Sequence, residues 1–135
     1  MQAALKISNL TGKTKWFATG PAQSAFPLYF PYSMAQLLAL YHQPADPAAF
    51  DRYYFETHVP LAKKIPGLRS YVVNDGPVNT IAGSPAPHFI AELSFDSMAD
   101  LQAALSSAEG QAAAGDLSNF AQAGVTLMVF ETKSA

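Results

Sequence analysis

The sequence predicts an α+β domain whose elements run β-α-β-β-α-β, the ferredoxin-like order in which a four-stranded antiparallel sheet carries helices on one face. Two observations lead to this prediction. Two strand-length apolar runs are each followed by an amphipathic helical pattern, and each of these pairs is completed by a further strand-like segment. The chain has 135 residues, 50% of them hydrophobic, which suits one domain with a substantial core.

The first strand and helix lie within residues 36–65. Residues 36–42 are apolar over the length of a strand, and Asp46 followed by Pro47 has the form of a helix cap with proline in the first turn. Pro60 lacks a backbone donor, so this helix should bend or break close to His58. The apolar stripe of the helix recurs at spacings of three and four and comprises Phe50, Tyr53, Tyr54, His58, Leu61 and Ile65.

Two further strands follow, at residues 68–74 and 88–95, because both are rich in β-branched or aromatic residues and the second alternates in polarity. The intervening residues 77–87 are longer than a usual hairpin connection, which suggests a rim or a lid. Asp96 or Ser97 should cap the second helix.

The end of the chain completes the pattern. The Ala/Gln-rich residues 102–114 suggest a surface helix, residues 116–120 a short helical or irregular connector, and residues 125–131 the fourth strand. The first and last strands are apolar at nearly every position, so both faces of the sheet should be covered, and the chain's own helices can cover only one. A homodimer through the sheet faces is the predicted solution.

Residues 1–33 differ from the rest and show neither strand alternation nor a helical period. We expect the domain to span residues 34–135, with residues 1–33 as an N-terminal extension, either a mis-called start before Met34 or a leader. This extension contains Lys6, Lys13 and Lys15 and no acid, so the domain itself is more acidic than the net charge of −2. An acidic domain without a basic stripe favours neither nucleic acid nor an anionic membrane as a partner.

Several motifs within residues 34–135 resemble one family. They are Phe50-Asp51-x-x-Tyr54-x-x-x-His58-x-Pro60-Leu61, then Pro66-Gly67-Leu68, Phe95-Asp96-Ser97-Met98 and Asp116-x-x-Asn119-Phe120. Together they resemble the EthD-like members of the dimeric α+β barrel superfamily. The resemblance implies a small cytoplasmic homodimer with a pocket between the helices and the sheet of each subunit. Relatives in this superfamily include proteins of ether-degradation clusters, lactone isomerases, polyketide-type cyclases and cofactor-free monooxygenases, all of which handle small apolar or aromatic molecules.

His58 is the candidate catalytic residue, because a partly buried imidazole can exchange a proton near neutral pH. The resemblance places the family's recurring histidine at His58 and its helical aromatic residue at Tyr54. A structural histidine that caps the broken helix or bonds a sheet carbonyl is the alternative. No acidic or serine side chain stands at a spacing that suggests a partner, since Asp51 is nearly two turns away and off the apolar face.

Tyr41 and Tyr54 are the candidate substrate-binding residues. Tyr41 and His42 must point to opposite faces of their strand, so only one of them can face the helices. If Tyr41 does, its hydroxyl and that of Tyr54 could polarise a carbonyl or hold an enol, although buried tyrosines more often bond the backbone. His88 is expected to be a solvated loop residue.

The chemistry expected from these residues needs no cofactor and no metal. The histidines lack metal-binding spacing, and no glycine-rich nucleotide motif follows a strand. One hypothesis is a cofactor-independent isomerase, cyclase, dehydratase or monooxygenase of catabolism, acting on a small apolar or aromatic molecule with His58 as a proton shuttle. The other is a non-catalytic protein that binds such a molecule or assists a degradation pathway.

Overall fold

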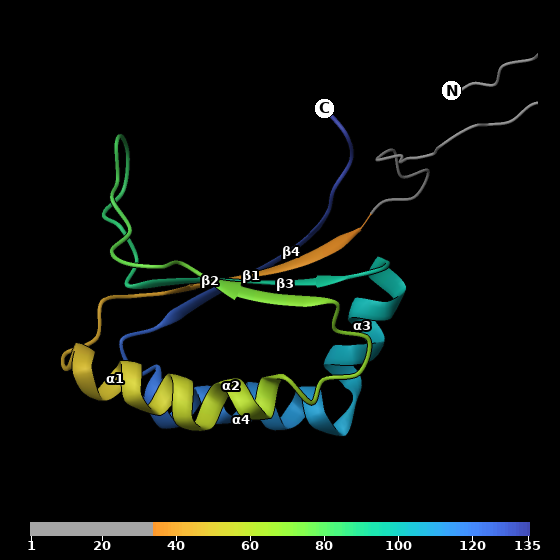
Figure 1. Ribbon diagram of the computed structural model, residues 1–135, viewed down its shortest axis with the longest axis horizontal. Helices are drawn as coiled ribbons and strands as arrows, with labels where there is room; N and C mark the ends of the chain where they lie inside the picture. Colours follow the sequence, from red (N-terminus) through yellow and green to blue (C-terminus); the bar gives the residue numbers. More distant parts are fainter. Residues whose placement is uncertain (1–33) are drawn as a thin grey trace, which may run out of the picture. The chain divides into compact units, whose positions relative to one another are not determined.

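A computed structural model describes residues 34–135, and these form a four-stranded sheet with all of the helices on one side (Figure 1). The strands are β1 (Ala35–Tyr41), β2 (Ser70–Val73), β3 (Phe89–Phe95) and β4 (Val125–Glu131). Their spatial order is β2-β3-β1-β4, and each neighbouring pair is antiparallel. This is the predicted ferredoxin-like α+β fold.

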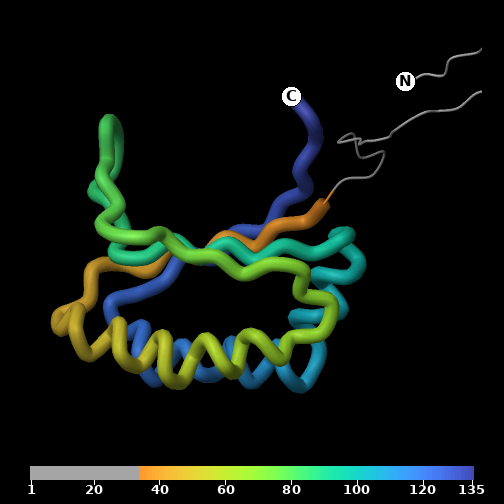
Figure 2. Tube along the Cα trace, viewed as in Figure 1, coloured from red at the N-terminus to blue at the C-terminus, as the bar shows by residue number. Residues whose placement is uncertain are grey.

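The helical layer consists of two rods that lie side by side beneath the sheet (Figures 1 and 2). The first rod runs through α1 (Pro47–Tyr53), a π-helical segment η2 (Tyr54–His58) and α2 (Val59–Ala62). The second rod is α4 (Ala108–Phe120), which follows the shorter helix α3 (Met98–Ser106).

The helices begin where the sequence predicts. Asp46 caps α1, and its Oδ1 accepts a hydrogen bond of 3.1 Å from the backbone N–H of Ala49. Ser97, rather than Asp96, caps α3 by accepting from the N–H of Asp100 at 3.0 Å.

The predicted disturbance near Pro60 takes the form of the π-helical segment. The backbone N–H of Val59 bonds the carbonyl of Tyr54, five residues back instead of four. This wider turn directly precedes Pro60, whose ring would clash with the carbonyl four residues earlier in a regular α-helix. The rod therefore continues past the proline with its hydrogen-bond pattern changed at His58.

The core lies between the sheet and the helices. Side chains at alternate positions of β1, from Ala35 to Tyr41, are buried under the helical layer, while Leu38 and Leu40 lie on the opposite face and are only partly covered. In the register, Tyr41 stands between Phe89 of β3 and Val125 of β4. We call the side of the sheet away from the helices the open face.

The connections differ in part from the predictions. Residues 116–120, predicted as a short helical or irregular connector, are helical, but they form the last part of α4, which is continuous from Ala108 to Phe120. The buried face of α4 includes Asp116, and an acid among apolar positions obscured the helical period. The loop at residues 77–87, predicted as a rim or a lid, rises on the open-face side of the sheet, away from the helices (Figure 2).

The predicted N-terminal extension, residues 1–33, lies outside the described residues. Within residues 34–135 no helix is long and apolar enough to cross a membrane.

Candidate functional site

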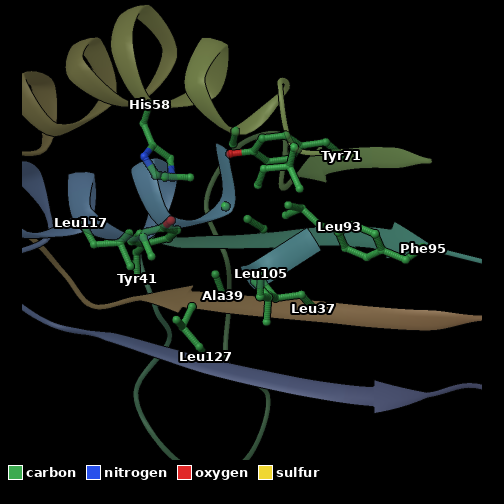
Figure 3. Close-up of a pocket in the computed structure, with 16 residues that line it drawn as sticks. Leu37, Ala39, Tyr41, His58, Tyr71, Leu93, Phe95, Leu105, Leu117 and Leu127 are labelled. Atoms are coloured by element: carbon green, nitrogen blue, oxygen red, sulfur yellow. The ribbon is translucent and has the colours of Figure 1, made fainter. Parts of the chain in front are cut away.

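An apolar cavity of about 80 Å³ lies between the helical layer and the sheet. All four strands contribute side chains to its wall, together with η2, α2, α3 and α4, and most of these side chains are aliphatic. The side chains that bring hydrogen-bonding groups to the wall are Tyr41, His58 and Tyr71 (Figure 3). The cavity is therefore an apolar site with a few polar groups, as is usual for small-molecule sites.

His58 is buried, with 5% of its surface exposed, and it pairs with Asp116 of α4, which is 6% exposed. The imidazole Nδ1 lies 3.0 Å from Asp116 Oδ2. The ring also packs on Phe120, with 4.7 Å between the ring centroids. The residue thus joins the two helical rods, because its hydrogen bond and its ring contact are both made to α4.

Asp116 receives hydrogen bonds from two further donors. The Tyr53 hydroxyl donates to Oδ1 at 2.6 Å, and the Asn119 side-chain amide donates to the same oxygen at 2.9 Å. Burial raises the pKa of Asp116, but the hydrogen bonds from Tyr53, Asn119 and His58 outweigh it and leave that pKa below its ordinary value. Asp116 is therefore a carboxylate at neutral pH.

The charge of Asp116 determines the tautomer of His58. Burial lowers the pKa of His58, and the hydrogen bond and charge of Asp116 oppose this without reversing it, so the ring is neutral at pH 7. A neutral ring carries one N–H, and beside a carboxylate that proton belongs on Nδ1. Nε2 then keeps its lone pair and is the basic nitrogen of a residue that lines the cavity.

Three tyrosine hydroxyls gather near this histidine. The hydroxyls of Tyr54 and Tyr71 are 2.8 Å apart, and the rings of Tyr41 and Tyr54 meet edge to face at 5.4 Å between centroids. Burial is the main cause of a raised pKa in all three. They are therefore neutral hydrogen-bonding groups and not phenolates.

The structure brings the three predicted site residues together, but only two of them line the cavity. His58 and Tyr41 line the cavity, and Tyr41 is the member of the Tyr41/His42 pair that faces the helices. Tyr54 is fully buried behind the cavity wall, and Tyr71 of β2 occupies the wall in its place.

Sequence reasoning found no partner for His58 and missed both Asp116 and Tyr71. The signal for Asp116 is its place on a helical stripe with Ala113 and Phe120, at spacings of three and four. For Tyr71 the only signal is the alternation of side chains along β2, which places it on the same face of the strand as Val73.

His88 is not a solvated loop residue, contrary to the sequence prediction. Its Nε2 lies 2.7 Å from Asp51 Oδ1, its ring stacks on Phe89 at 4.7 Å, and only 16% of its side chain is exposed. It ties α1 to the start of β3 and is not part of the cavity wall. Across residues 34–135 no group of three or more potential metal ligands comes together.

The fold and the site define a ferredoxin-like domain with a buried histidine–carboxylate pair at an apolar cavity. The EthD domain profile matches residues 42–124, and an 11.0 kDa protein encoded in the thcB-thcC intergenic region of Rhodococcus erythropolis is 41% identical over 96 residues, which cover 70% of this chain and 91% of that protein. The chain belongs to the EthD family.

Solved structures are similar over the same region. An ethyl tert-butyl ether D (EthD) family protein from Bacillus halodurans C-125 is 41% identical, with a TM-score of 0.67, over 74% of this chain and 99% of that one. A dimeric ferredoxin-like protein of unknown function from Thermobifida fusca YX shares the fold, with 17% identity and a TM-score of 0.57 over 81% of this chain and all of that one.

Proposed function

We propose that the protein is a cofactor-independent enzyme in which His58 takes a proton from a small apolar molecule held in the cavity. The observation that carries this proposal is the 3.0 Å contact between His58 Nδ1 and Asp116 Oδ2, which favours a neutral ring with a basic Nε2. A histidine oriented by a buried carboxylate is a common arrangement for a general base. The catabolic context of the proposal rests on the family name, which refers to ethyl tert-butyl ether.

The cavity volume limits the substrate. A dry protein cavity of roughly 150 Å³ accepts benzene, and the present cavity measures about 80 Å³. The enclosed part of the substrate should therefore be smaller than a benzene ring, or the substrate should extend out of the cavity.

The test is deuterium uptake from D2O by a panel of small ketones and lactones, followed by NMR. His58→Gln should abolish enzyme-dependent uptake in a protein that still folds, with a melting temperature lowered by at most roughly 10 °C through loss of the hydrogen bond to Asp116. His88→Gln is the matched control, because it removes the other histidine that bonds a carboxylate but does not line the cavity. Equal uptake by the wild type and His58→Gln would contradict the proposal. Ligands that raise the melting temperature without any uptake or conversion would favour the non-catalytic binding protein instead.

The homodimer through the sheet faces is part of the proposal. Apolar side chains on the open face are strongly exposed in the single chain, among them Val72 at 54%, Met128 at 45% and Phe130 at 40%. The similar Thermobifida fusca protein is dimeric, which supports a dimer here, and the exposed apolar side chains are what favours the sheet face as its interface. Met128→Glu should convert the dimer to monomer in analytical ultracentrifugation, whereas Phe55→Glu, on the helical layer, should not. A wild-type monomer at micromolar concentration would refute this part.

A further inference from the structure

The tyrosine cluster contains more donor protons than it can use internally. Tyr41, Tyr54 and Tyr71 bring three hydroxyl protons, and a chain of three hydroxyls can form at most two hydrogen bonds among its members. The 2.8 Å contact between Tyr54 and Tyr71 is one of these. At least one O–H is therefore left for another acceptor.

The remaining donor belongs to the cavity. Tyr54 has no exposed surface, while Tyr41 and Tyr71 both line the cavity. In Figure 3 the Tyr71 side chain reaches from β2 toward the helix that carries His58, with its hydroxyl oxygen leading. When Tyr54 donates to Tyr71, the proton of Tyr71 is the one left over. Tyr71 is half-buried at an apolar wall, where a hydroxyl without an acceptor is unfavourable, so a ligand oxygen is favoured at this place.

The charge of the ligand follows from the rest of the wall. None of the residues that line the cavity is a lysine or an arginine, and His58 is neutral. A carboxylate or phosphate would be buried there without a compensating cation, which is strongly unfavourable. The ligand oxygen is therefore that of a neutral group.

We propose that the substrate is a small neutral carbonyl compound whose oxygen accepts a hydrogen bond from Tyr71 while an adjacent C–H faces His58 Nε2. This inference rests on the proposed function of His58. Nε2 takes the proton from the carbon next to the carbonyl, the electrons of that C–H bond form a C=C bond, and the carbonyl π electrons move to the oxygen. The resulting enolate is held by the Tyr71 hydroxyl. The imidazolium then returns the proton to the same carbon or to another one, so exchange or isomerisation results without an oxidant or a reductant.

The roles of the other tyrosines are secondary. Tyr54 orients the Tyr71 hydroxyl through their 2.8 Å contact and is a positioning residue. The raised pKa values of Tyr54 and Tyr71 keep both as donors that stabilise negative charge without losing their own protons.

Cyclopentanone is the probe, since its carbonyl group can be enclosed while the rest of its five-membered ring extends out of the cavity. Its α-proton exchange in D2O should be accelerated by the wild-type protein and should fall roughly 100- to 1000-fold in Tyr71→Phe, the usual loss when one donor to a developing oxyanion is removed. Tyr54→Phe should give a smaller loss. The melting temperatures of the variants should stay close to that of the wild type, and Tyr71→Phe should lower the exchange rate more than it raises the concentration for half-saturation.

Infrared spectroscopy of bound cyclopentanone separates this inference from the role of His58. The C=O band should shift to lower frequency in the wild type and in His58→Gln, and the shift should disappear in Tyr71→Phe. Exchange that depends on His58 but is unchanged in Tyr71→Phe would overturn the inference and leave the proposed function intact. A band shift that depends on Tyr71, without exchange, would support carbonyl binding and remove His58 as the base. Absence of any binding of cyclopentanone would overturn the inference.

Discussion

Replacing Asp116 with asparagine tests the tautomer on which the chemistry depends. The amide oxygen can still accept from Tyr53 and Asn119, which share Oδ1 in the wild type. The position of Oδ2, however, becomes an NH2 donor that faces His58 Nδ1 at 3.0 Å. Two donors cannot share a hydrogen bond, so the imidazole proton should move to Nε2. The nitrogen that should act as the base then becomes a donor.

The expected cost follows from the hydrogen bonds of the wild-type carboxylate. One buried hydrogen bond to a charged acceptor is lost, worth about 1.5–3 kcal/mol. For a domain of this size that corresponds to a fall in melting temperature of roughly 10 °C. Deuterium exchange into a substrate should fall by about 10²- to 10⁴-fold, because a histidine in the wrong tautomer cannot accept the proton.

Two-bond ¹H–¹⁵N NMR spectra of the imidazole distinguish the two tautomers directly. The wild type should show Nδ1–H at His58 and Asp116→Asn should show Nε2–H. Asp51→Asn is the matched control, because Asp51 pairs with His88 at a half-exposed position and its loss should cost at most about 1 kcal/mol. An Nε2–H tautomer in the wild type, or an unchanged tautomer in Asp116→Asn, would refute the reasoning.

Three further predictions concern stability. Because the pKa of His58 is lowered in the folded protein, the contribution of its neutral ring to the free energy of unfolding is fully present above the ordinary pKa of 6.5 and is lost as the pH falls through the folded pKa. Chemical denaturation at a series of pH values from 8 to 5 should show this loss. His58→Gln should remove this pH-dependent part of the stability. Gly115→Ala should stabilise α4 by up to about 1 kcal/mol, since a Cβ at this helical position meets nothing within 4 Å. Gly110→Ala should destabilise the protein in the same denaturation assay, because its Cβ would collide with the backbone carbonyl of Ala104; a ranking in which the alanine at 110 is the more stable would contradict both expectations.

The sequence was sufficient for the order of the strands and helices because local signals agreed with the final structure. Asp46 and Ser97 both act as the predicted helix caps, and alternation correctly placed Tyr41 toward the helices. Such signals need only neighbouring residues, so no knowledge of tertiary contacts is required.

The site was harder to predict because its key contacts join residues distant in sequence. His58 and Asp116 are 58 residues apart, and only the packing of α4 beside η2 brings them together. Asp116 was also hard to recognise as a buried residue. An acidic side chain on an apolar stripe suggests that the helix ends there, unless the groups that donate hydrogen bonds to it are known. Those donors, Tyr53 and Asn119, come from both helical rods.

The π-helical segment places His58 and Pro60 within two residues of each other in one continuous helical rod. A π turn contains one residue more than the α turn it replaces, so deleting a single exposed residue such as Glu56 would restore a regular helix. Because only the extra residue is removed, Val59 would still bond the Tyr54 carbonyl, now four residues back, and the residues after it would keep their place on the helix. The Pro60 ring would then meet the carbonyl four residues before it, a clash that the wider turn avoids. The π turn thus allows one helix to contain both His58 and Pro60, and a deletion, unlike a substitution, would test this directly.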